Sequence, residues 1–340
     1  MLSIFFIRKG GAENKSIRRV GLLLCVLGVG ALILFGALGT KQGVLSLLGT
    51  VFLYVALTQA WNILGGYGGY LNFGTATFFG VGAYTTGVLF QYYGLSPFLT
   101  APLAGLMAAL LGIVIGIPTL RLRGAYFAIV TMIITFAIQI LVFGLPFTQG
   151  PMGIFLPPFK LSPLAVERLF YFLFLSLAVV VTLLVYAIEN SNFGWALVAI
   201  REDEDAAEVI GVKTTMIKYI ANAIATFIIG ALGGLYAQRI MYIDPTGVFS
   251  FDVSLNVVLM AVIGGAGTWQ GPLIAAPLIL VVADMLRVTF TSEVNRVIFS
   301  IVVIVIALYL PHGAMGFMTS LRQKFLKGRK PEISDEAASA

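Results

Sequence analysis

The chain holds few groups that could carry out covalent chemistry. Its single cysteine, Cys25, excludes an internal disulfide and a cysteine-based metal cluster, and its single histidine, His312, excludes a site with several histidine ligands. No H-E-x-x-H motif, paired-carboxylate site or nucleophile with a histidine partner is present. The nearest text to a phosphate loop, GGAENKS, has Asn14 where a glycine must precede the lysine. The sequence therefore predicts no catalytic residue, no metal site and no ATPase machinery of its own.

The charged residues are instead concentrated in one stretch, REDEDAAEVIGV, from Arg201 to Val212. It contains five of the chain's 15 acidic residues. Apolar residues recur at Ala206, Val209 and Ile210, a helical spacing that predicts a short amphipathic helix. We expect Glu202 or Asp203 to cap its start and Gly211 to stop it in the left-handed conformation. A solvated connector is the alternative, but the apolar face would then need a surface to pack on.

The composition defines the elements that must position this segment. The 340 residues are 59% hydrophobic and 11% charged, with a mean hydropathy of +0.99, whereas soluble domains carry about 25% charged residues. We therefore expect an all-α polytopic membrane protein, because a soluble core could not absorb so much apolar sequence. Segments near the length of a membrane-spanning helix, about 20 residues, number ten: 20–38, 43–64, 73–93, 97–118, 124–145, 166–188, 218–240, 253–266, 271–289 and 294–311.

The basic residues orient these segments. With a cytoplasmic N-terminus, 15 of the 21 lysines and arginines lie in cytoplasmic segments, as the positive-inside rule requires. Both termini are basic, so the number of crossings is even: about ten, or eight if 253–289 is re-entrant. The predicted organisation is a basic cytoplasmic N-terminus (1–19), a transmembrane domain (20–317) with a cytoplasmic loop at about 189–217, and a cytoplasmic tail (318–340) without apolar anchors.

Mild polar groups within the apolar segments are candidates for a translocation path. Interhelical hydrogen bonding is the alternative role for each of them. The glycine-rich stretch GGYGGYLNFG (65–74) predicts either a helix broken at membrane depth, whose ends could bind a polar substrate, or a tight cytoplasmic turn. VIGGAGTWQGPLIAAPLIL (262–280) repeats the pattern of glycines between two apolar segments. The path candidates are Asn62, Asn72, Thr75, Thr77, Asn222 and Asn256.

Several blocks resemble the permease subunits, of the M type, of branched-chain amino-acid ABC importers. D-A-A-x-x-x-G, from Asp205 to Gly211, is similar to the family's E-A-A-x-x-x-G loop. The resemblance extends from about Ala60 to Phe317. It covers NILGGYGGYLNFGTATFFGVGAYTTGVL, LRGAYFAIVTM, FGWALVAIREDEDAAEVIGV, GALGGLYAQ, AVIGGAGTWQGPLIAA and PHGAMGF.

The resemblance implies a permease in a bacterial or archaeal cytoplasmic membrane, and not an enzyme. Two permease subunits, often different chains, would form the path, two cytoplasmic ATPases would use ATP and Mg, and a solute-binding protein would deliver substrate from outside. The E-A-A loop would be the coupling helix that docks on the ATPase. The residues carried over to that role are Asp205, Ala206, Ala207, Glu208 and Gly211.

One departure bears on the substrate. The family commonly has SLGHA where this chain has NFGTA, so Thr75 replaces a histidine and a titratable group is lost. Branched-chain or related amino acids are the expected substrates. Urea or short amides are the alternative, and a stand-alone secondary transporter is a further one; the absence of an acidic residue at a clear midplane position disfavours the latter.

Overall fold

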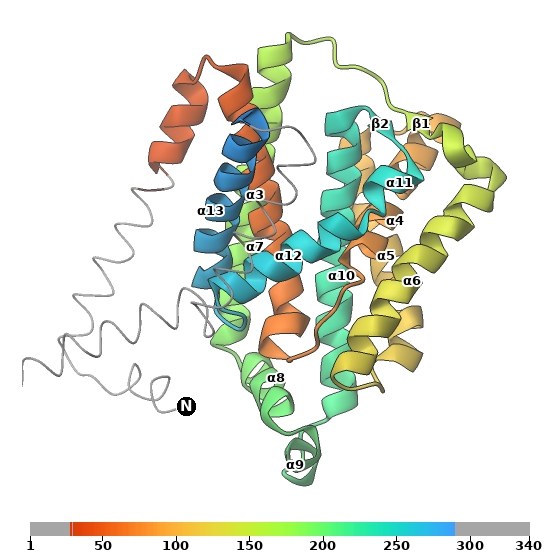
Figure 1. Ribbon diagram of the computed structural model, residues 1–340, viewed down its shortest axis with the longest axis vertical. Coiled ribbons are helices and arrows are strands. Elements are labelled where there is room, and N and C mark those ends of the chain that lie inside the picture. The colour runs from red at the N-terminus through yellow and green to blue at the C-terminus, as the bar shows by residue number, and fades with distance from the viewer. Residues whose placement is uncertain (1–27, 29, 290–340) are drawn as a thin grey trace, which may run out of the picture. The chain divides into compact units, whose positions relative to one another are not determined.

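The computed structural model describes residue 28 and residues 30–289, which are almost entirely helical (Figure 1). Six of the described helices are long and apolar enough to cross a membrane: Gln42–Tyr67, Phe98–Thr119, Ala125–Gly144, Pro163–Glu189, Thr214–Ile240 and Pro245–Gly264. Cys25, His312, the N-terminus (1–19), the tail (318–340) and the expected span 294–311 lie outside the described residues. The fold class, an all-α membrane protein, is thus confirmed in its coarser form.

The helices follow the expected apolar segments closely. The long ones are α3 (Gln42–Asn62), α4 (Thr75–Tyr93), α5 (Pro97–Thr119), α6 (Ala125–Gly144), α7 (Pro163–Glu189), α10 (Thr214–Ile240), α12 (Phe251–Gly264) and α13 (Gln270–Thr289). Residues 30–38, within the first expected span, are also helical. Every expected span within the described residues is therefore a helix, because a long apolar run satisfies its backbone polar groups internally only in this way.

The chain divides into two compact units. Of the described residues, the first unit comprises 28, 30–49 and 159–173. Within it the Tyr171 hydroxyl donates to the carbonyl oxygen of Leu32 at 2.8 Å, and Arg168 Nη2 donates to the carbonyl oxygen of Gly39 at 3.0 Å. These two bonds join helix 30–38 and the residue that follows it to the first part of α7.

Among the described residues, the second unit comprises 50–158 and 174–289, and α10 packs at its centre against α4 and α5 (Figure 1). Small residues allow the close approach. A Cβ on Gly82 would lie 2.0 Å from the carbonyl oxygen of Gly230, and a Cβ on Gly230 would lie 2.3 Å from Cβ of Ala108. Small residues on these three helices thus serve helix packing, as they commonly do in membrane proteins.

Shorter elements close one end of this unit. They are two 3-10 turns (Pro146–Thr148 and Gly150–Met152), β1 (Ile154–Phe155), β2 (Tyr242–Ile243) and α11 (Pro245–Val248). The two strands pair antiparallel, with Ile154 opposite Ile243. Both isoleucines are buried in one cluster with Tyr84, Val248 and Phe249. The proline-rich segment after α6 is therefore built of ordered turns and a strand.

The segment expected to be two spans or a re-entrant pair is a pair of packed helices. A Cβ on Gly264, at the end of α12, would lie 2.4 Å from the carbonyl oxygen of Gly271 in α13. The chain reverses at Gly265 and Gly267, which both have positive φ (111° and 80°). Glycine adopts this conformation without strain, so the glycine cluster sets the turn.

Candidate functional site

The glycine-rich stretch after α3 is a genuine helix break. The α-helix ends at Asn62, five residues of π-helix follow (Ile63–Tyr67), and α4 begins only at Thr75. The backbone N–H of Phe73 donates to Thr131 Oγ1 at 3.1 Å, which places the start of α4 beside the interior of α6 and away from that helix's ends. Helix ends surrounded by other helices need polar partners, and Thr131 supplies one here.

Asn62 joins the two glycine-rich segments of the sequence. Its Oδ1 accepts from the backbone N–H of Gly267 at 2.8 Å, and its Nδ2 donates to the carbonyl oxygen of Thr268 at 2.9 Å. Gln59, one turn earlier, donates to the carbonyl oxygen of Trp269 at 2.6 Å. Asn62 is fully buried. The similarity of the two segments thus corresponds to direct contact, and Asn62 has a bridging role.

Three of the predicted path residues meet around a small crevice. Asn72 precedes α4, Thr77 lies in its first turn and Asn222 lies in α10; all three line the crevice, with Thr119 and Thr131. A hydrogen bond also joins two of the helices that line the crevice: Asn222 Nδ2 in α10 donates to the carbonyl oxygen of Gly112 in α5 at 2.8 Å. Its polar lining consists of neutral amide and hydroxyl groups.

Besides Asn62, two further path candidates lie outside this crevice. Thr75 is buried, and its hydroxyl has no hydrogen-bond partner among the described residues. Asn256 lies on α12, half-buried, beside the Tyr54 side chain. Sequence reasoning missed Thr119, Thr131 and Thr135, whose hydroxyl lies 2.8 Å from that of Thr77. Their only signal is a threonine within an apolar run, which is also common in helices without a path.

The acidic stretch contains the end of α8 (Asn192–Glu202) and all of α9 (Glu204–Val209). Asp203 caps α9, because its Oδ1 accepts from the backbone N–H groups of Asp205 and Ala206, each at 3.0 Å. Of the two expected caps, Asp203 is thus the observed one, while Glu202 ends α8.

Gly211 ends α9 as predicted. Its φ is +90°, its N–H donates to the carbonyl oxygen of Glu208 at 2.9 Å, and the N–H of Val212 donates to that of Ala207 at 3.0 Å. This pair of bonds is the Schellman motif, which favours glycine at the left-handed position.

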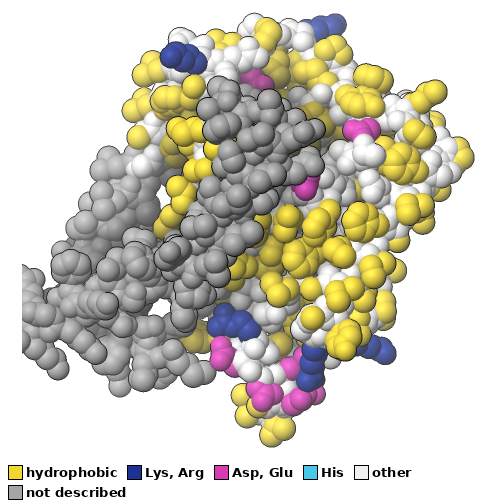
Figure 2. Space-filling model, viewed as in Figure 1, with side chains coloured by type: hydrophobic (Ala, Val, Ile, Leu, Met, Phe, Trp, Pro, Cys, Tyr) yellow, Lys and Arg dark blue, Asp and Glu magenta, His cyan; other side chains and the backbone are white. Residues whose placement is uncertain are grey.

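The apolar side chains of α9 lie outward. Val209 is 88% exposed and Ile210 is 77% exposed, whereas Ala207 is buried. Figure 1 shows α9 beyond the ends of α8 and α10, and Figure 2 shows hydrophobic atoms at this tip, beside acidic side chains. The predicted apolar face of Ala206, Val209 and Ile210 is therefore exposed, whereas the capped turn directs Ala207 inward.

Two acids of the stretch form ion pairs with residues outside it. Asp205 forms two hydrogen bonds with Arg123, at 2.7 and 3.0 Å, and Arg123 holds the pKa of the exposed Asp205 carboxyl below its usual range. Glu204 pairs with Lys218 and lies 3.3 Å from Arg123 Nε. Burial alone would raise the pKa of Glu204, but hydrogen bonds from Lys218 and Tyr70 and the charges of Lys218 and Arg123 lower it. Both acids are therefore held ionised.

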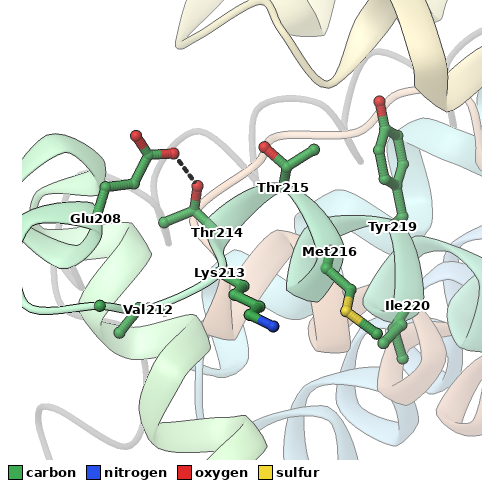
Figure 3. Close-up of a pocket in the computed structure, with 9 residues that line it drawn as sticks. Glu208, Val212, Lys213, Thr214, Thr215, Met216, Tyr219 and Ile220 are labelled. Atoms are coloured by element: carbon green, nitrogen blue, oxygen red, sulfur yellow. Dashed lines mark hydrogen bonds between the residues drawn. The ribbon is translucent and has the colours of Figure 1, made fainter.

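An open depression lies beside α9 (Figure 3). It has a volume of about 650 Å³ and is lined by Glu208 and by residues 211–216, 219 and 220. Glu208 reaches across to accept a hydrogen bond from the Thr214 hydroxyl, as Figure 3 shows. The bond ties the end of α9 to the first turn of α10.

Six membrane-length helices, one of them broken inside, define a multi-pass membrane protein. A sequence profile described as "Branched-chain amino acid transport system / permease component" matches residues 43–308, so the chain belongs to that family. It is a multi-pass protein of the inner membrane and a permease.

Three relatives illustrate the similarity. The chain is 30% identical over 316 residues to the high-affinity branched-chain amino acid transport system permease protein LivM of Salmonella typhimurium, covering 85% of this chain and 73% of the relative. The Escherichia coli LivM is 30% identical over 302 residues (81% and 70%). A probable LivM of Methanocaldococcus jannaschii is 26% identical over 255 residues (64% and 74%). No solved structure matches.

Proposed function

We propose that this chain is a permease subunit of an ATP-binding-cassette importer and forms part of the path for branched-chain amino acids or related substrates. The observation that carries the proposal is the placement of α9. It stands beyond the ends of α8 and α10 with Val209 and Ile210 exposed, yet its ends are held by the Asp203 cap and by Gly211. A rigid apolar projection of this kind suits a coupling helix that docks on a separate protein.

The coupling role divides among the residues of this helix. Ala206 and Glu208 are exposed next to Val209 and Ile210 and provide the contact surface. Asp205, which is paired with Arg123, and the buried Ala207 orient the helix, while Gly211 sets its end. The depression beside α9 receives part of the docked ATPase.

The topology that fits this role has α9 on the cytoplasmic side. Arg121, Arg123, Arg201, Lys213 and Lys218 lie in or next to the segments at that end of the helices, in accord with the positive-inside rule. Both termini are then cytoplasmic, with about ten crossings, or eight if 253–289 is re-entrant. The basic segment 1–19 and the tail 318–340 flank the transmembrane domain of 20–317, whose coupling loop is 189–217.

The path proposal concentrates on the crevice formed by Asn72, Thr77 and Asn222. Thr75 and Asn256 lie outside its lining, and Asn62 is occupied by Gly267 and Thr268. Neutral amide and hydroxyl groups suit a zwitterion with an apolar side chain. They suit urea or a short amide as well, which keeps an importer of those compounds as the second candidate.

The remaining subunits of the importer are other chains. They are a second permease subunit, two ATPases that use ATP and Mg, and an extracytoplasmic solute-binding protein. This chain supplies no catalytic residue and holds no cofactor in the proposal. Its lack of a phosphate-loop sequence supports a separate energy source.

Reconstitution tests the proposal. The chain is assembled with a second permease, two ATPases and a solute-binding protein of this kind of importer, and uptake of labelled leucine into liposomes is measured with and without ATP. We expect ATP-dependent uptake in which valine competes more strongly than urea; stronger competition by urea would select the second candidate. Uptake by this chain alone, driven by an ion gradient, would contradict an ABC importer.

A further inference from the structure

Tyr70 connects the helix break to the acidic stretch. Its hydroxyl donates to Glu204 Oε2 at 2.9 Å and accepts from Lys218 Nζ at 3.1 Å. Tyr70 is 7% exposed, and its ring meets Phe127 edge-on at 5.2 Å. A residue of the break between α3 and α4 is thus bonded at once to α9 and to the first turns of α10.

The charges at this point leave little freedom. Lys218 donates to Tyr70, to Glu204 and to the carbonyl oxygen of Leu120, which uses all three donors of an ammonium group. Glu204 Oε1 accepts a hydrogen bond from Lys218, and its Oε2 accepts one from Tyr70 and lies near Arg123. Separating the Lys218–Glu204 pair would leave a buried charge without a partner, and withdrawing Tyr70 would remove one hydrogen bond from each of them. The start of α9, the first turns of α10 and Tyr70 therefore favour moving together.

Arg201 is a second contact between the same two segments. It lies near the end of α8, and its Nη1 donates to the carbonyl oxygen of Gly66 at 3.2 Å. Gly69, with φ +77°, passes so close that a Cβ there would lie 2.6 Å from Arg201 Cγ. The acidic stretch therefore holds the break at two points, Gly66 and Tyr70.

The break leads directly to the crevice. Asn72, two residues after Tyr70, lines it, and Phe73 bonds to Thr131 at the start of α4. Only Leu71 separates Tyr70 from Asn72. The carbonyl oxygen of Asn72 accepts from Trp61 Nε1, and its Oδ1 accepts from the backbone N–H of Gly74, each at 2.7 Å. A shift of Tyr70 therefore reaches Asn72 through one residue, and it reaches the start of α4 through the bond between Asn72 and Gly74.

We propose that Tyr70, Glu204 and Lys218 form the joint through which movement of α9 reaches the crevice, with Arg201 as its second point of contact. This inference rests on the proposed coupling role of α9. It gives Glu204, the least exposed acid of the stretch, a contact with the helix break, and it makes Tyr70 a positioning residue.

The test uses the complete reconstituted importer with Tyr70→Phe, which keeps the ring and removes only the hydroxyl. Tyr93→Phe, at the exposed end of α4, is the matched control. We expect the importer with Tyr70→Phe to hydrolyse ATP at the wild-type rate. The amount of leucine taken up per ATP hydrolysed should fall by roughly fivefold, because that factor corresponds to the net free energy of one hydrogen bond. The control keeps the wild-type ratio.

Hydrogen–deuterium exchange supplies a second readout that needs no transport. In the wild-type importer, ATP-driven closure should change exchange both in residues 203–211 and in residues 63–74. In Tyr70→Phe only residues 203–211 should respond. An unchanged uptake ratio, or a wild-type segment 63–74 that does not respond, overturns the joint. If the wild-type importer shows no ATP-driven uptake, the proposed function is contradicted. Exchange in the ATPase-bound wild type tests the joint independently of uptake, and it does so even if the variant fails to assemble.

Discussion

The Lys218 ammonium and the Glu204 carboxylate form an ion pair whose side chains are only 7% and 11% exposed. It links the first turns of a membrane-length helix to the helix that projects beyond it. A buried pair contributes modestly as a whole, but removing one partner is costly because the other charge remains buried.

Lys218→Met should therefore lower the free energy of unfolding by about 3 kcal/mol, because Glu204 loses its main partner. Denaturation of the purified chain in detergent measures this. Lys213→Met is the matched control, since Lys213 is exposed and its loss should change stability little. Equal effects of the two substitutions would show that the Lys218 pair has no special weight.

The stability of the wild type should also depend on acid pH. The folded pKa of Glu204 lies below its usual value, so its stabilising contribution is present above the unfolded pKa of about 4.3 and is lost as the pH falls through the folded value. Melting temperatures between about pH 6 and pH 3 should fall less for Glu204→Gln than for the wild type. Glu202→Gln, a change at the exposed neighbour, is the comparison; a Glu204→Gln slope as steep as the wild type's would contradict the assignment.

The exposed apolar tip of α9 makes a prediction about association. Val209→Ser with Ile210→Ser should leave stability nearly unchanged, because both side chains are exposed. The double variant should weaken ATPase binding by about 3 kcal/mol, or roughly 100-fold in affinity, if both side chains are buried on docking. Pull-down titration in detergent measures the affinity. Met152→Ser, at another exposed apolar residue, should have no effect; wild-type affinity of the double variant would remove α9 from the interface.

The left-handed end of α9 can be tested against an equivalent position. Gly211 and Gly94 have φ of +90° and +64°, and neither has an atom within 4 Å of a built Cβ. Valine at either position carries a similar backbone cost of about 1–2 kcal/mol. Only Gly211→Val should reduce uptake per ATP hydrolysed, because only it redirects α9. Equal coupling in the two variants would count against the role of Gly211.

The contact between the two glycine segments has no room for a methyl group. A Cβ on Gly66 would lie 1.7 Å from Asn62 Oδ1 and 2.4 Å from the backbone nitrogen of Gly267. Gly66→Ala should destabilise the chain by on the order of 2–3 kcal/mol, because backbone must shift. Gly144→Ala, with no atom within 4 Å, should be neutral or slightly stabilising in thermal denaturation. A tolerated Gly66→Ala would mean that this contact opens easily.

Much of this protein is determined by local sequence. A long apolar run must be helical in lipid, so the expected spans within the described residues became helices from α3 to α13. The Asp203 cap and the Gly211 stop are equally local, since each depends on a side chain or a φ value within a few residues. The family motifs lie on the same short stretches, which is why they could be recognised.

The tertiary structure decided which residues distant in the sequence lie against one another. Asn62 faces Gly267 and not a path, Glu204 faces Lys218 and Tyr70, and Ala207 is buried while Val209 and Ile210 are exposed. A polar residue in an apolar run has the same local pattern whether it lines a crevice or bonds a neighbouring helix. Its role depends on which helix lies opposite, and that follows from the packing of small residues such as Gly82 on Gly230.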